Sequence, residues 1–130
     1  MNVTALAAAT FAVGVVGVIA FQVALALGVP WGAYAMGGAS PGRFPARLRI
    51  AAIVQAGLLA LMALIVLSRA GLVLAGWSEV ARWMIWPVVA LTIVAVVLNA
   101  ITPSAAERRI WLPVTVVMLA SVLVVALTAT

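Results

Sequence analysis

The chain alternates between four long apolar stretches and three shorter connectors. Each stretch is built mostly from Ala, Val, Leu and Ile, and each is close to the ~20 residues that a helix needs to cross a bilayer. The stretches cover Thr4–Leu27, Ala46–Ser68, Val80–Ile101 and Arg109–Thr128. The pattern therefore predicts an all-α fold: a single domain, residues 1–130, that is a bundle of four transmembrane helices.

Residues at the ends of these stretches favour the same boundaries. Gly28 and Gly71 are placed to end the first and second helices, and Pro45 suits the first turn of the second. Ser104 and Glu107 have the S-x-x-E spacing of a capping box, which predicts the start of the fourth helix.

The composition excludes most enzyme chemistry. Hydrophobic residues make up 68% of the chain and charged residues 7%, whereas a soluble domain carries roughly a quarter charged residues. The chain has no Cys, His, Lys or Asp, so thiolate or imidazole metal sites and every nucleophile–histidine pair are excluded. We expect no enzymatic activity, no metal and no cofactor.

The net charge of +5 comes from seven arginines and two glutamates. In so apolar a chain this excess favours anionic lipid headgroups as partners, and not nucleic acid. Arginine without lysine, beside abundant Ala, Val and Gly, indicates a GC-rich coding genome. We therefore expect a multi-pass protein of a bacterial cytoplasmic (inner) membrane.

The arginines also predict an orientation. Five of them flank the connectors 28–49 and 102–108, namely Arg43, Arg47, Arg49, Arg108 and Arg109, whereas Arg69 and Arg82 lie on the other side. Because cytoplasmic loops are enriched in Lys and Arg, the first side should be cytoplasmic. Both termini and the connector 69–79 would then be extracytoplasmic.

Two pairs of these arginines lie in the first turns of predicted helices. Arginine is unfavourable there by ~0.3–1 kcal/mol unless an anion lies nearby, because helix N-termini carry partial positive charge. Arg47, Arg49, Arg108 and Arg109, with Arg43 in the connector, are therefore candidate ligands for anionic groups. One interpretation is contact with lipid phosphates together with orientation; the other is a specific anion held between two helix ends.

Three amide side chains lie in the same half of the bilayer as these arginines. Gln22, Gln55 and Asn99 are expensive in hydrocarbon and should face a partner or a wet cavity. They either join helices by hydrogen bonds worth ~0.6–2 kcal/mol each, or line a polar cavity. No carboxylate lies deep in a predicted span, which argues against proton- or cation-coupled transport.

The first helix carries a stripe of small residues that includes Gly14 and Gly17. Such stripes let helix backbones approach closely. The two glycines are expected to pack against another helix, either within the bundle or across a homodimer.

The connectors also carry a resemblance. The strings "PWGAYAMGG", "PGRFPARLR" and "NAITPSAAERRIWLPV" resemble a family of small, uncharacterised four-span bacterial membrane proteins with a PWG…GG…GxxPxxxR cytoplasmic connector. The resemblance implies a fold and a location but no mechanism.

Two functions remain open from the sequence. The first is a non-enzymatic membrane protein that binds anionic lipid or a protein partner at its arginine-rich cytoplasmic face. The second is a dimeric channel or transporter for an anion or small molecule.

Overall fold

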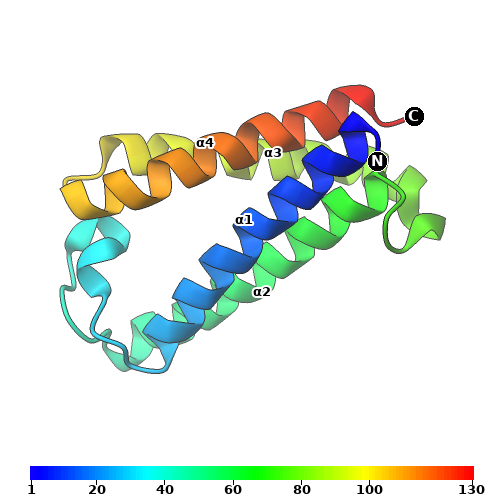
Figure 1. Cartoon of the computed structure of the whole chain (residues 1–130). Coiled ribbons are helices and arrows are strands. Elements are labelled where there is room, and N and C mark those ends of the chain that lie inside the picture. The colour runs from blue at the N-terminus through cyan, green and yellow to red at the C-terminus, as the bar shows by residue number, and fades with distance from the viewer.

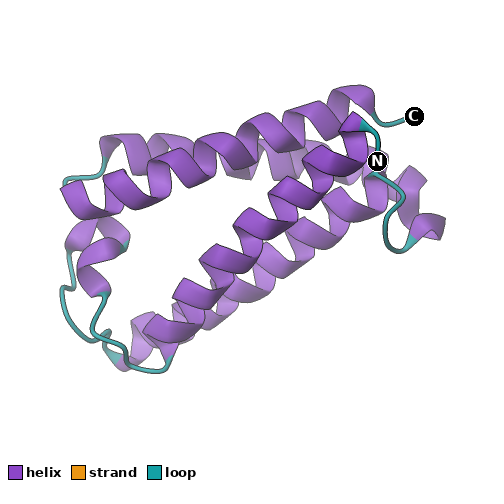
Figure 2. Ribbon diagram, viewed as in Figure 1, coloured by secondary structure: helices purple, strands orange, loops and turns teal.

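The computed structural model describes all 130 residues and consists of four α-helices with short connectors (Figures 1 and 2). The helices are α1 (Val3–Ala26), α2 (Ala46–Arg69), α3 (Ser78–Ile101) and α4 (Ala105–Thr128). Short 3-10 turns occupy the connectors: η1 (Gly32–Tyr34), η2 (Met36–Gly38) and η3 (Ala75–Trp77). The predicted all-α fold is confirmed, and every α-helix is long and apolar enough for a multi-pass membrane protein.

The helix boundaries follow the predicted spans closely, with one clear difference. α4 begins at Ala105, four residues before the predicted apolar span. Its first turn carries Glu107 and Arg108, and these charged residues lie outside the apolar stretch. α1 and α2 end at the expected glycines: Gly28 has φ 93° and Gly71 has φ 77°. At both ends the N–H groups of the glycine and of the next residue donate to carbonyls of the last turn at 2.9 to 3.1 Å. These hydrogen bonds satisfy carbonyls that the end of the helix leaves without a partner.

α1 and α2 form one hairpin, and α3 and α4 form a second. The two hairpins meet at one end and diverge at the other. α1 packs against α2 and α4, and α3 packs against α2 and α4. The helices converge where both chain termini and residues 70–77 lie, which we call the terminal end (Figure 1). The hairpins separate at the connector end, which comprises residues 27–45 and 102–104 (Figure 1).

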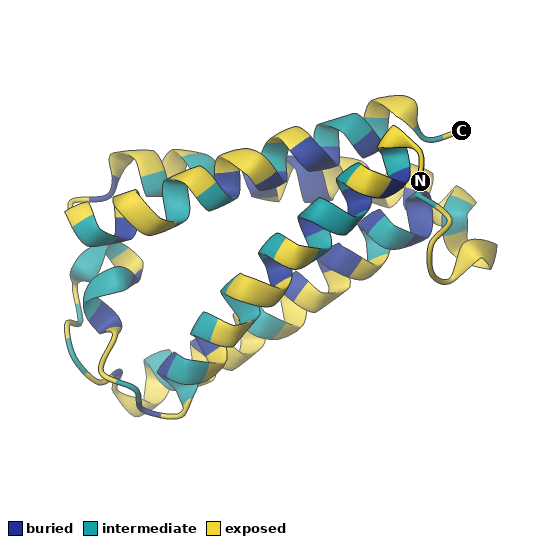
Figure 3. Cartoon of the chain, viewed as in Figure 1, coloured by how far each residue is buried: buried dark blue, intermediate teal, exposed yellow.

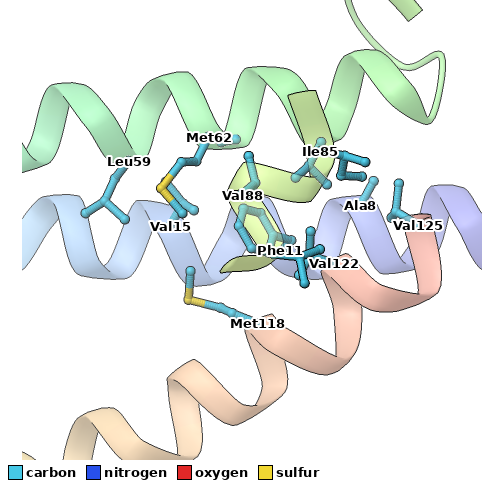
Figure 4. Packing of buried hydrophobic residues seen from close by; sticks show 13 residues of the cluster. Ala8, Phe11, Val15, Leu59, Met62, Ile85, Val88, Met118, Val122 and Val125 are labelled. Atoms are coloured by element: carbon cyan, nitrogen blue, oxygen red, sulfur yellow. The ribbon is translucent and has the colours of Figure 1, made fainter. Parts of the chain in front are cut away.

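The main hydrophobic core lies where the helices converge (Figures 3 and 4). Its 13 buried residues come from all four helices: Ala8, Phe11, Val15, Leu59, Met62, Ala63, Val66, Ile85, Val88, Val89, Met118, Val122 and Val125. A smaller cluster of Leu25, Ala35, Phe44 and Ala52 fixes the first connector to α1 and α2. The bundle is therefore tightly packed toward one end and closed by a connector at the other.

Arg69 reinforces the terminal end. Its side chain is only 8% exposed, and its guanidinium donates to the carbonyl of Ala129 at 3.1 Å and to the hydroxyl of Ser78 at 3.3 Å. Glu79 lies 4.0 Å from the same guanidinium. These contacts join the end of α2 to the start of α3 and to the residue after α4.

Candidate functional site

A cavity of about 630 Å³ lies between the two hairpins, on the connector side of the main core. All four helices line it, and Tyr34 to Gly37 of the first connector and Thr102 with Pro103 border it toward the connector end. Of its 28 lining residues, 19 are hydrophobic. The cavity is therefore an apolar chamber with a small number of polar groups, as is usual for ligand sites.

The side of the cavity between α2 and α3 is open. Leu58 of α2 and Leu91 and Leu98 of α3 line it and are 42 to 58% exposed. The side between α1 and α4 is closed by Phe21 and Trp111, whose ring centroids are 4.8 Å apart. In a bilayer, the opening between α2 and α3 would face lipid acyl chains.

The three predicted amides all line this cavity. Gln22, Gln55 and Asn99 reach it from three different helices. None of them forms a hydrogen bond to another helix: Asn99 donates to the carbonyl of Ala95 at 2.8 Å, one turn earlier in α3. Gln22 is 9% exposed and has no hydrogen-bond partner in the chain. The three amides therefore line one largely apolar cavity, and no hydrogen bond between helices involves them.

Glu107 is the functional candidate that the sequence analysis missed. It lies in the first turn of α4, is 7% exposed and lines the cavity. Its Oε2 accepts a hydrogen bond from the backbone N–H of Gly37 at 3.3 Å. The predicted capping box is half formed: Ser104 Oγ accepts from the N–H of Glu107 at 3.1 Å, but the N–H of Ser104 donates to Thr102.

Glu107 lies on the inward stripe of α4. Glu107, Trp111, Thr115 and Met118 all line the cavity and follow one another at helical spacing. The stripe continues into the core residues Val122 and Val125. Glu107 therefore extends the inward stripe of α4 toward the connector end, although its charge suggests an aqueous position.

Glu107 has no cationic partner. Both ion pairs of the chain use Glu79 at the terminal end, with Arg69 at 4.0 Å and Arg82 at 3.8 Å. The cavity thus contains a buried carboxylate whose charge no arginine of the chain neutralises.

The five candidate arginines surround the connector end but do not line the cavity. Arg43, Arg47, Arg108 and Arg109 are exposed, and Arg49 is half-buried. Arg49 Nε donates to the carbonyl of Ala26 at 2.7 Å, and Arg108 donates to the carbonyl of Thr102 at 2.8 Å. Each therefore satisfies a carbonyl at the end of the preceding helix, which explains why arginine is tolerated at a helix start.

The two arginine pairs belong to different hairpins. Arg47 and Arg49 begin α2, whereas Arg108 and Arg109 begin α4, and these helix ends diverge at the connector end (Figure 1). This placement favours contacts with separate phosphates over one anion held between both helix ends.

The two candidate packing glycines have different surroundings. A Cβ on Gly14 would lie 2.7 Å from Cγ of Met118, so Gly14 packs against α4 as expected. A Cβ on Gly17 would meet no atom within 4 Å, and Gly17 is exposed. The expectation is thus corrected for Gly17 within the bundle, because no atom of a neighbouring helix lies against it.

Fold and site together define a multi-pass, all-α membrane protein with an internal cavity of ligand size. Comparisons of the chain with protein-family models, curated proteins and solved structures find no match. No three His, Cys, Asp or Glu side chains come together as a metal site. The chemistry of the site is therefore inferred from the cavity itself.

Proposed function

We propose that this is a non-enzymatic membrane protein that binds an amphiphilic membrane molecule in the cavity between its hairpins. The cavity is the observation that carries the proposal. Its volume of about 630 Å³ falls within the ~300–1,000 Å³ of small-molecule sites. Its lining combines many apolar side chains with a few convergent polar ones, which matches a molecule with an apolar body and a polar head.

The position of the opening supports entry from the membrane. An apolar tail that entered between α2 and α3 would contact Leu58 and Leu91, which are exposed on the outer surface. The head would lie nearer the connector end, among Gln22, Gln55 and Asn99. This arrangement places each part of the molecule in surroundings of matching polarity.

The exposed arginines have a second, separate role in the proposal. They surround the connector end without a carboxylate partner, so they favour the phosphates of anionic lipids around the protein. The same arginines favour a cytoplasmic location for the connector end, in the inner membrane of a bacterium. Lipid bound in the cavity and lipid bound at the arginines would therefore be different molecules.

Filling the cavity tests the proposal. Ala95 lines the cavity, whereas Ala90 is exposed on the same helix and does not line it. In native mass spectrometry from phosphatidylcholine nanodiscs supplemented with dodecanol and dodecylammonium, wild type and Ala90→Phe should retain one of these amphiphiles per protomer at activation energies that remove it from Ala95→Phe. Equal retention by all three proteins would contradict cavity binding. In nanodiscs that also contain an anionic phospholipid, Arg47→Gln/Arg49→Gln should instead lower the retention of the anionic lipid only.

A transporter is the second candidate, and the shape of the molecule favours it. The cavity lies in the connector half, opens between α2 and α3, and is closed toward the terminal end by the main core. Alternating access requires such a one-sided cavity between two helical units. Movement of a fluorescent short-chain lipid across the membrane of proteoliposomes would favour transport if Ala95→Phe abolishes it. Binding in the cavity without such movement would favour the binding protein.

A further inference from the structure

We infer that the cavity selects amphiphiles whose head group is a hydrogen-bond-donating cation, and that Glu107 binds this cation. The inference rests on the proposed function, because it requires that an amphiphile occupies the cavity. It names the chemical class of that molecule: a lipophilic amine in its ammonium form.

The burial of Glu107 and its lack of hydrogen-bond partners are the first observation. The side chain is 7% exposed, lines the cavity and accepts a single protein hydrogen bond, from Gly37 at 3.3 Å. A carboxylate can accept about four hydrogen bonds, and burying it without a cation is costly. An ammonium group in the cavity would supply both the missing donors and the missing charge.

The arginines are the second observation, because none of them forms an ion pair with Glu107. Arg108 is adjacent to Glu107 in sequence, yet its guanidinium donates to the carbonyl of Thr102 at 2.8 Å. No arginine lines the cavity, so Glu107 is its only charged residue. A phosphate or carboxylate head group would meet a like charge there, whereas an ammonium would meet an opposite one.

The side-chain oxygens of two amides suit the same head. Asn99 uses its Nδ2 to donate to Ala95, which leaves its Oδ1 free to accept. Gln22 is nine-tenths buried and unpartnered, so its amide oxygen is also free. Trp111 lies one helical turn beyond Glu107 and packs against Phe21, and both rings line the cavity. Aromatic rings attract cations through their faces.

Three probes with one alkyl chain and different head groups test the inference: dodecylammonium, dodecanol and dodecanoate. Binding is measured by calorimetry in phosphatidylcholine nanodiscs, with empty nanodiscs subtracted. Wild type should bind dodecylammonium at least about tenfold more tightly than dodecanol, a difference of about 1.4 kcal/mol, because the ammonium brings an opposite charge and two more donors than the hydroxyl. Dodecanoate should bind most weakly.

Glu107→Gln should remove the preference for the cation and leave dodecanol binding unchanged, since the amide oxygen can still accept from Gly37. Retained dodecanol binding also shows that the variant has kept its cavity. Glu79→Gln is the matched control, because it removes the same charge from an exposed site at the terminal end and should keep the preference. Loss of the preference in Glu79→Gln, or its survival in Glu107→Gln, would overturn the inference.

The outcomes separate this inference from the proposed function. If all three probes bind wild type equally, the cavity binds amphiphiles without charge selection and only the inference is lost. If none binds, the proposed function is lost as well. Replacing half of the phosphatidylcholine by phosphatidylethanolamine should leave the affinity for dodecylammonium unchanged. A marked fall would show that phosphatidylethanolamine competes for the site. That result would overturn the assignment of the site to an amine without a phosphate.

Discussion

Gly14 and Gly17 show what one turn of helix decides at the scale of single residues. Both belong to the same stripe of small residues, and the sequence offers no reason to separate them. In the structure only Gly14 faces α4, where Met118 fills the space that a side chain would need. The difference depends on where α4 contacts α1. The spacing of small residues within α1 gives no information about the position of α4.

We predict that Gly14→Val destabilises the protein and that Gly17→Val does not. A larger side chain at Gly14 must displace Met118, and overpacking of this kind costs about 1–3 kcal/mol. At Gly17 the change should stay within about 0.5 kcal/mol, as for other substitutions that meet no neighbour. Unfolding in mixed micelles of increasing SDS content measures both values.

Equal stability losses in the two variants would contradict the observed packing of α1 on α4. A change of elution volume with Gly17→Val alone would instead identify its face as the contact with a second protomer.

The cavity residues were partly predictable for a physical reason. Gln22, Gln55 and Asn99 stand out as polar residues in apolar stretches, and helix rise places them at similar depth. All three line the same cavity. Glu107 was missed because charge near a span end is ordinarily solvated. Its burial depends on the first connector, which covers it and donates the N–H of Gly37.

Ser104 joins two elements at the connector end. Its hydroxyl accepts from the N–H of Glu107 at the start of α4, and it donates to the carbonyl of Ala33 in η1 at 2.7 Å. One side chain thus caps a helix and fixes the connector to it. The sequence predicted the cap through the S-x-x-E spacing, but not the contact between segments 71 positions apart.

We predict that Ser104→Ala lowers the free energy of unfolding by about 1–2 kcal/mol, through loss of the cap and of the bond to Ala33. Hydrogen exchange should accelerate at Gly37, because the connector is then held less firmly. Ser40→Ala is the control within the same connector, since no hydrogen bond of the Ser40 side chain is present. Unchanged exchange at Gly37 in Ser104→Ala would show that Ser104 does not hold the connector.

For the whole molecule, hydropathy predicted the four helices well, because each span needs a similar length of apolar residues. It could not predict that the hairpins diverge. All four spans are apolar on every side, so their composition does not distinguish lipid-facing from helix-facing residues. The divergence follows from tertiary contacts: core packing at the terminal end, and the connector seated between the hairpins at the other.

We predict that the connector end is cytoplasmic, from the distribution of arginines. The chain contains no cysteine, so Ser40→Cys and Leu74→Cys each introduce a single thiol. A membrane-impermeant maleimide added to intact cells should label position 74, and position 40 only after permeabilisation. The reverse pattern would place both termini in the cytoplasm.

The divergence of the hairpins gives the molecule the outline of a wedge (Figure 1). In a bilayer, such an outline displaces more lipid from one leaflet than from the other. The free energy of the protein then depends on how tightly each leaflet is packed, since lateral compression of the wider side favours a smaller angle between the hairpins. Membrane curvature and lateral pressure would thereby act on the volume of the cavity, and bilayer mechanics would become a determinant of its occupancy.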